Sequence, residues 1–193
     1  MADPARKLSY TFAEYIELEE ASGTKHEFLN GEVFAMSGGT LEHSQIAANV
    51  IGELRAQLRG RRCTVFTSDA RVRVRSTGLA TYPDVSVVCG SIERDPDNQN
   101  TLTNPVTLVE VLSDSTEGYD REETFSHYRR IPSLREYLLV SQRERRMEHF
   151  MRNDDGTWTL RDAAPPDIVR LLSIGCELSF EEVYRDPFAE ASA

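Results

Sequence analysis

The sequence predicts a mixed α/β (α+β) domain built around a central sheet. Apolar residues recur at helical spacing in some segments and alternate or run continuously in several short ones, and the inferred order is helix, hairpin, helix, strands, helix, strands. The 193 residues, 39% hydrophobic and 28% charged, are enough for one domain with a sizeable core. We therefore expect a single domain over 1–193 with its core at about 12–172, and loose ends at 1–8 and 187–193.

Two segments in the first third of the chain predict helices. "SYTFAEYIELEEASG" offers Ser9 or Thr11 as an N-cap and ends at Gly23. "LEHSQIAANVIGELRAQLRGRR" places four apolar residues on one helical stripe: Ile46, Val50, Leu54 and Leu58.

Between these helices, "KHEFLNGEVFAM" predicts a β-hairpin. Asn30-Gly31 lies between two apolar-rich runs, which is typical of a two-residue turn. In that register Glu27 opposes Phe34. Four side chains then share one face of the hairpin: Lys25, Glu27, Leu29 and Glu32.

The remaining segments predict further strands and one helix. "CTVFTSDARVRVRS" indicates one or two strands with Arg71, Arg73 and Arg75 on one face, which we expect to be solvated, with contact to phosphates as the alternative. "SIERDPDNQNTLTN" indicates an exposed loop. "YPDVSVVCG" and "VTLVEVLSDST" predict strands, and "DREETFSHYRRI" predicts a helix beginning near Asp120. "REYLLVSQ", "RRMEHFMRN" and "TWTLRD" predict a meander, followed by a short apolar element at 168–172 and a helical turn near 181–184.

Charge and cysteine content limit the classes of protein. A net charge of −10 argues against non-specific coating of DNA, although it leaves room for a local basic groove. The chain lacks a transmembrane-length apolar run and a signal peptide, so we expect a cytoplasmic protein without membrane contact. Cys63, Cys89 and Cys176 fit neither a zinc spacing nor a disulfide framework, which favours small core residues.

Two acidic residues suggest chemistry. Asp84 opens one predicted strand, and Glu110 lies 26 residues later inside the apolar run "VTLVEVL". If these strands are neighbours, the two carboxylates form a hard oxygen site for Mg²⁺ or Mn²⁺, which would also offset the burial of Glu110. The alternative is that Asp84 caps its strand and Glu110 pairs with one of the 20 arginines.

Pro83-Asp84 followed by Glu110 in an apolar strand resembles the PD-(D/E)XK nuclease superfamily. Within it, the chain is similar to a large bacterial family of restriction-endonuclease-like proteins, the Uma-two family. The likeness covers about 12–150 and depends on the ordered set "KHEFLNGEVFAMSGGTLEHSQIA", "YPDVSVVCG" and "LVEVLSDSTEGYDREETFSHYRRIPSLREYLLVS". It implies a restriction-endonuclease-like fold and metal-dependent hydrolysis of DNA phosphodiesters.

The resemblance also implies roles for particular residues. Asp84 and Glu110 would bind the metal, and Glu27 matches an acidic residue of the family's hairpin. His43 matches a histidine at the start of the long helix, where it would contact phosphate, orient a carboxylate or make ordinary hydrogen bonds. Glu32 is a second acid on the hairpin face, with a solvated role as the alternative.

The sequence departs from the superfamily at its lysine. The residue two positions after the glutamate is Leu112, and the position on the following helix where the family often carries lysine is Thr124. Only Lys7 and Lys25 exist in the chain, so Lys25 is the candidate amine near the site. Asp114 replaces the family's usual proline after "EVLS".

Arginine is not a usable base near neutral pH, so Arg121 or Arg129 would only stabilise charge on a bound phosphate. Tyr119, His127 and Tyr128 are expected to be packing or surface residues.

Three functions follow from this pattern. The first is a Mg²⁺- or Mn²⁺-dependent DNA endonuclease, in which Lys25 or metal-activated water replaces the missing lysine. The second is an inactive nuclease-fold module that binds nucleic acid or a protein, and the third is a metal-dependent hydrolase of another phosphate ester. A homodimer is expected by fold analogy alone.

Overall fold

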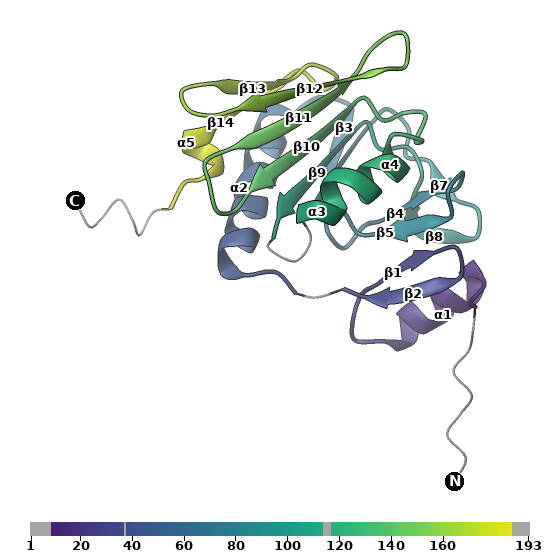
Figure 1. Cartoon of the computed structure of the whole chain (residues 1–193). Coiled ribbons are helices and arrows are strands. Elements are labelled where there is room, and N and C mark those ends of the chain that lie inside the picture. The colour runs from purple at the N-terminus through teal and green to yellow at the C-terminus, as the bar shows by residue number, and fades with distance from the viewer. Residues whose placement is uncertain (1–8, 37, 114–116, 187–193) are drawn as a thin grey trace.

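The computed structural model describes residues 9–36, 38–113 and 117–186, and it contains two six-stranded sheets and a separate hairpin. The first sheet has the order β2-β1-β5-β4-β8-β7, and the second has the order β12-β11-β10-β9-β6-β3 (Figure 1). The strands of the first sheet are β1 (His26–Leu29), β2 (Glu32–Ala35), β4 (Arg71–Val74), β5 (Leu79–Thr81), β7 (Arg94–Asp95) and β8 (Asn98–Leu102). Those of the second are β3 (Cys63–Thr67), β6 (Val85–Cys89), β9 (Thr107–Leu112), β10 (Glu136–Ser141), β11 (Met147–Arg152) and β12 (Trp158–Ala163). The predicted mixed α+β class is confirmed, but the strands divide between two sheets rather than forming one.

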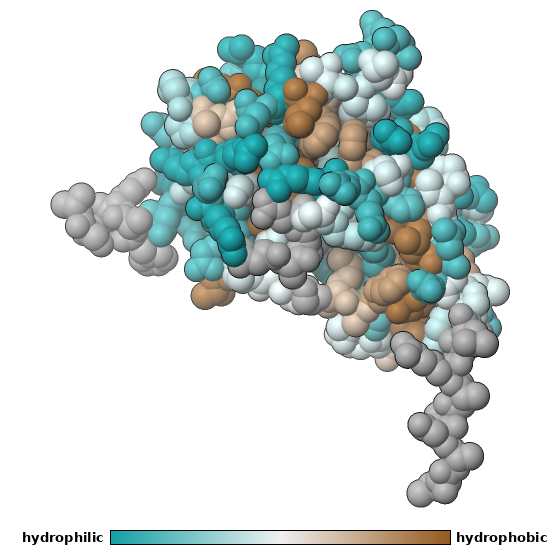
Figure 2. All heavy atoms as spheres, in the orientation of Figure 1, coloured by the Kyte–Doolittle hydropathy of each residue, from teal (hydrophilic) through white to brown (hydrophobic). Residues whose placement is uncertain are grey.

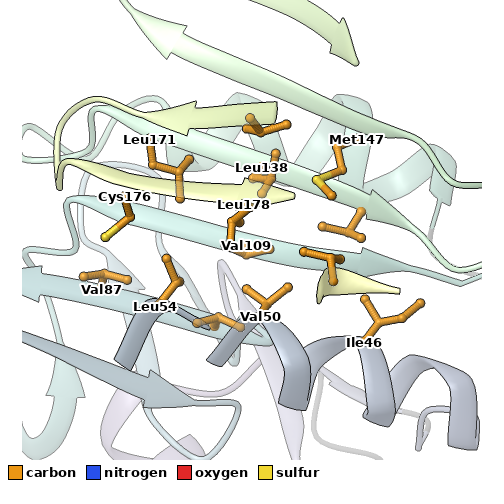
Figure 3. Close-up of a cluster of buried hydrophobic side chains, with 14 of the residues drawn as sticks. Ile46, Val50, Leu54, Val87, Val109, Leu138, Met147, Leu171, Cys176 and Leu178 are labelled. Carbon is orange, nitrogen blue, oxygen red and sulfur yellow. The ribbon is translucent and has the colours of Figure 1, made fainter. Parts of the chain in front are cut away.

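One face of the second sheet packs against helix α2 (Leu41–Gln57), the hairpin β13 (Ile168–Leu171)–β14 (Cys176–Ser179) and helix α5 (Phe180–Val183). Figure 3 shows Ile46, Val50 and Leu54 of α2 pointing into this layer. The predicted stripe of α2 is buried, and the core continues beyond Leu172 to Val183.

The other face of the second sheet lies under an irregular helix that connects the parallel strands β9 and β10. The helix comprises α3 (Glu117–Tyr119), a π-helical turn η1 (Asp120–Thr124) and α4 (Phe125–Tyr128), and it crosses the front of the sheet (Figure 1). Single π-helical turns inside helices are frequent at functional sites. The predicted helix near Asp120 is therefore present but begins no later than Glu117.

The N-terminal part follows the sequence prediction closely. Helix α1 (Phe12–Ala21) begins with a capping box between Thr11 and Glu14, and it packs against β1 and β5. Asn30 and Gly31 both have positive φ, of 49° and 97°, as a type I′ turn requires. The predicted register of the hairpin is confirmed, with Glu27 opposite Phe34.

The expected solvated arginine face is wrong for Arg71 and Arg73, whereas Arg75 is exposed. Arg71 is buried, and its guanidinium donates to the Tyr82 hydroxyl at 2.6 Å; Arg73 is partly buried and contacts the buried Asp95 at 2.8 Å. Residues 91–104 are largely exposed as expected, but they do not form a loop, since they contain β7 and β8 and extend the first sheet. Asp95 of β7 pairs with Arg73 of β4, and Arg71 of β4 pairs with Glu19.

The expectation of unpaired cysteines fails as well. Cys63 and Cys89 are cross-strand partners on β3 and β6, and they form a disulfide. The pairing depends on strand register, which Cys spacing alone does not reveal; Cys176 is buried and free.

Several predictions fall outside the described residues: the ends 1–8 and 187–193, Lys7 and Asp114. Among the residues that are described, no helix combines the length and the apolarity needed to cross a membrane.

Candidate active site at the Asp84–Glu110 pair

Asp84 and Glu110 lie side by side on neighbouring strands. Val85 of β6 pairs with Val109 of β9, which places Asp84, the residue before β6, next to Glu110. The backbone N–H of Asp84 donates to Glu110 Oε2 at 3.0 Å, and that of Val111 donates to Asp84 Oδ2 at 2.8 Å. Each carboxylate is thus held by the backbone beside the other, and the spacing-based prediction that the two acids meet is correct in geometry.

Glu110 is a buried carboxylate with a like charge beside it. Its residue is 9% exposed, and burial, followed by the charges of Asp84 and Asp120, raises the pKa of the carboxyl well above its usual range. Two hydrogen bonds oppose this shift, from the Asp84 N–H and from the fully buried Tyr128 hydroxyl to Oε1 at 2.9 Å. The sequence-based alternative, an ion pair between Glu110 and an arginine, is not observed among the described residues.

His43 contacts Asp84. Its Nε2 lies 3.1 Å from Asp84 Oδ2, near the start of α2, where Thr40 caps the helix and accepts from the His43 N–H. The contact with Asp84 raises the pKa of the His43 imidazole above its ordinary value, although partial burial opposes the shift. Of the roles considered for His43, the geometry favours orientation of a carboxylate.

Glu27 lines the same cavity as this pair. It lies on β1, and its Oε1 accepts a hydrogen bond from the hydroxyl of Tyr119 in α3. Tyr119 and Tyr128 therefore fix two of the acids from the same irregular helix. Burial and the bond to Glu27 raise the pKa of the Tyr119 hydroxyl, so it remains a proton donor in this bond at neutral pH.

The predicted cationic residues are less central. Lys25 borders the site, but its Nζ donates to Asp69 Oδ1 at 2.7 Å and to the Ser68 carbonyl at 2.8 Å. Arg121 donates to Glu148 on β11, with its Nη2 at 2.6 Å from Oε1, and is not among the described residues that line the site. The hairpin residue Glu32 is exposed and likewise lies off the site.

The two positions expected for lysine are both buried. Leu112 is part of the apolar core on the α4 side of the second sheet. Thr124, the last residue of η1, borders the site and is 3% exposed. Its Oγ1 is buried without a hydrogen-bond partner among the described residues.

A cavity of about 550 Å³ lies between the two sheets and the irregular helix. Its wall is formed by residues of β1, β2, β5, β9, the start of α2 and α3–η1–α4, together with Asp84, which precedes β6. Its lining includes four acids, Glu27, Asp84, Glu110 and Asp120, together with Lys25, His43, Thr124 and three tyrosines, Tyr82, Tyr119 and Tyr128. The sequence did not identify Tyr119 and Tyr128 as site residues. The only available signal was their spacing of nine residues around a helix that follows Glu110.

The donor set fits a divalent cation with few protein ligands. No group of three or more His, Cys, Asp or Glu side chains with metal-ligand geometry occurs in the described part of the chain. Mg²⁺ is commonly bound through one or two carboxylates, with water and phosphate completing its octahedron. The described contacts of Asp84 both reach Oδ2, so Oδ1 faces no competing donor among the described residues.

A solved structure shares the fold of this chain. A crystal structure described as a "putative nuclease belonging to DUF820", from Anabaena variabilis ATCC 29413, has a TM-score of 0.73 over 91% of this chain and 97% of that chain. At 19% sequence identity, this likeness shows a shared fold.

The family follows from sequence. A model of the Uma2 family, described as "Putative restriction endonuclease", matches residues 12–181, and the chain belongs to this family. Two Synechocystis proteins are also similar: the uncharacterized protein slr1290 is 37% identical over 89% of this chain and 90% of its own length. The uncharacterized protein sll1609 is 35% identical over 79% of this chain and 86% of its own length.

Proposed function

We propose that this protein is a divalent-metal-dependent DNA endonuclease whose metal is held by Asp84 and Glu110. The observation that carries the proposal is the pair itself, two adjacent carboxylates that line a cavity, Glu110 held by the N–H of Asp84 and Asp84 held by the N–H of Val111. A buried carboxylate beside a like charge is costly in the absence of a cation, and Glu110 has no arginine or lysine partner among the described residues. Membership of a family described as restriction endonucleases supports DNA as the substrate.

When bound, Mg²⁺ or Mn²⁺ would lower the pKa of water and neutralise charge on the phosphodiester. Asp84 and Glu110 would hold the cation, and Tyr128 and the two backbone N–H groups keep both carboxylates in one orientation. His43 fixes the Asp84 carboxylate from the side of α2. Glu27, held by Tyr119, is the acid in place to accept a proton from water across the cavity.

Cleavage of supercoiled plasmid in Mg²⁺ or Mn²⁺ tests this proposal. We expect Asp84→Asn and Glu110→Gln to reduce the cleavage rate by at least about 100-fold, since each removes a charged metal ligand. Glu32→Gln is the matched control, because this exposed acid belongs to the same hairpin as Glu27 but lies outside the described cavity lining. Undiminished cleavage by both variants of the central pair would refute the assignment.

A second function, a binding module without turnover, is favoured by one specific observation. The superfamily's lysine position is filled by Leu112 in the core, and the Lys25 amine is engaged by Asp69. This function requires DNA association without cleavage in any divalent metal. Titration calorimetry with Mn²⁺ separates the two, because tight binding that is lost in Glu110→Gln favours the enzyme.

A further inference from the structure

A groove between the end of α4 and the β11–β12 strands has a composition that differs from the rest of this acidic protein. It encloses about 760 Å³, and its wall carries Arg129, Arg130 and Arg152 beside Trp158. None of the described residues that line it is acidic. In a chain of net charge −10, a surface with three guanidinium groups and no carboxylate is a local positive site.

The arginines of this groove are not used for ion pairs. Elsewhere Arg71, Arg73 and Arg121 each contact a carboxylate, but no ion pair joins Arg129 or Arg130 to an acid within the described residues. Both side chains are exposed. The third, Arg152, is anchored by donation from Nη1 to two backbone carbonyls at 3.2 Å. The groove therefore combines one fixed guanidinium with two available ones.

Trp158 supplies a flat surface beside these charges. Phe125 packs edge-on against its ring, with centroids 5.2 Å apart, and the Arg152 guanidinium lies 5.9 Å from the ring centroid. The indole is partly exposed. Arginines that flank a supported aromatic ring are the combination by which proteins bind single-stranded nucleic acid, the arginines contacting phosphate and the ring stacking on a base.

The groove lies on the same side of the second sheet as the cavity. Glu110 on β9 is aligned across β10 and β11 with Asp162 on β12, and Trp158 lies four residues before Asp162 on that strand. Three strand spacings and four residues along a strand correspond to a distance of roughly 20 Å between Trp158 and Glu110. That separation corresponds to about six base steps of DNA. In the space-filling view, hydrophilic residues cover most of the visible face, and hydrophobic residues appear in small groups between them (Figure 2).

We propose that this Arg129–Arg130–Trp158 groove binds a single-stranded segment of the nucleic acid, outside the cavity that would cut it. Two phosphates contact Arg129 and Arg130, and one base stacks on Trp158. The identity of the bound strand as DNA rests on the proposed function, whereas the binding of a phosphodiester strand rests on the groove alone.

Trp158 is the single tryptophan of the chain, so its fluorescence reports directly on the groove. Wild-type protein in EDTA is titrated with an oligothymidylate of about 12 nucleotides. We expect quenching of Trp158, and a dissociation constant that rises about tenfold in Arg129→Gln/Arg130→Gln. The slope of log affinity against log salt should fall by about 1.4 in this variant, because two phosphate contacts are lost.

Arg161→Gln is the matched control, since Arg161 is an exposed arginine of the same strand β12 that points to the opposite face. It should leave affinity and salt slope unchanged. Trp158→Leu, followed by the anisotropy of a labelled oligonucleotide, should weaken binding by about tenfold or more. If Trp158→Leu does not fold, the arginine pair still decides the question.

Absence of quenching, or equal affinity in the Arg129/Arg130 and Arg161 variants, would overturn the proposal. Polyglutamate that binds as tightly as the oligonucleotide, with the same arginine dependence, would overturn nucleic acid as the occupant and assign an acidic protein segment. The oligonucleotide titration is carried out without metal, so its result does not depend on whether the protein cleaves DNA. Groove binding without Mg²⁺-dependent cleavage refutes only the endonuclease, and cleavage without groove binding refutes only the groove.

Discussion

Replacement of Glu110 by glutamine should stabilise the metal-free protein while it abolishes metal binding. The folded state raises the pKa of this carboxyl above its unfolded value near 4.5, chiefly through burial and then through Asp84. The protonated Glu110 carboxyl therefore stabilises the folded state relative to the ionised one at pH below about 4.5, and this stabilisation is lost as the pH rises through the raised pKa. Above that range, the ionised group opposes folding, whereas the uncharged amide introduced by Glu110→Gln would not.

The magnitude follows from the local contacts. Glutamine has nearly the same shape, so its Oε1 can still accept from Tyr128 or from the Asp84 N–H, while the charge beside Asp84 disappears. Burial of an ion costs several kcal/mol, and the two hydrogen bonds to Glu110 recover part of this, so that about 2 kcal/mol remains. We expect Glu110→Gln to raise the free energy of unfolding in EDTA at pH 8 by about this amount, which is a rise of about 4–8 °C in Tm. At pH 4 the difference should vanish.

Thermal unfolding with and without Mg²⁺ measures both parts of this prediction. A metal at 100 times its dissociation constant stabilises the folded wild type by about 2.7 kcal/mol, whereas Glu110→Gln should gain little. The order of the two melting temperatures should therefore reverse when Mg²⁺ is added. If Glu110→Gln is no more stable than the wild type in EDTA, the Glu110 charge does not destabilise the metal-free fold. If Mg²⁺ stabilises both proteins equally, Glu110 is not a metal ligand.

Two further changes test the surroundings of this pair, and a third tests Glu136, a buried carboxylate of β10 outside the cavity whose partners are His149, Leu172 and Ser173. Tyr128→Phe removes the hydroxyl that donates to Glu110, so Mn²⁺ affinity measured by calorimetry should fall about tenfold, and unchanged affinity would exclude Tyr128 from positioning the ligand. Thr124→Lys restores an amine to the cavity wall and should raise the single-turnover cleavage rate at least tenfold; no increase would mean that the missing lysine is not what limits turnover. Glu136→Gln should lower the free energy of unfolding at pH 7 by about 3 kcal/mol in urea titrations. Despite burial, bonds from His149 and Ser173 lower the pKa of Glu136, so this loss should shrink as pH falls below about 4.5; a loss that does not depend on pH would contradict it.

The sequence predicted local features whose cause is local. The Asn30-Gly31 dipeptide defines its own turn and hence the register that places Glu27 on the cavity side. Asp84 and Glu110 were expected to meet because an acid in an apolar strand needs compensation, and strands joined by a short excursion are commonly neighbours.

Features that depend on partners distant in sequence were not predictable in the same way. Arg73 looks like a solvated residue until β7 brings the buried Asp95 against it, and β7 itself was predicted as loop because its residues are polar. Tyr128 resembles any core aromatic of an amphipathic helix, and only the packing of α4 over β9 directs its hydroxyl to Glu110. A hydrogen bond between side chains 18 residues apart leaves no periodic signal.

The two proposals assign different charges to binding and to hydrolysis. Four acids line the cavity, Lys25 there is paired with Asp69, and the His43 ring contacts Asp84, so the metal-free cavity would repel a phosphodiester. A bound divalent cation would reverse the sign of this region. The Arg129–Arg130–Trp158 groove would attract the strand whether or not metal is present, because its arginines are not engaged by carboxylates of the described residues. Under these proposals, affinity for nucleic acid and the requirement for metal would reside in different residues, so a net charge of −10 does not conflict with a polyanionic substrate.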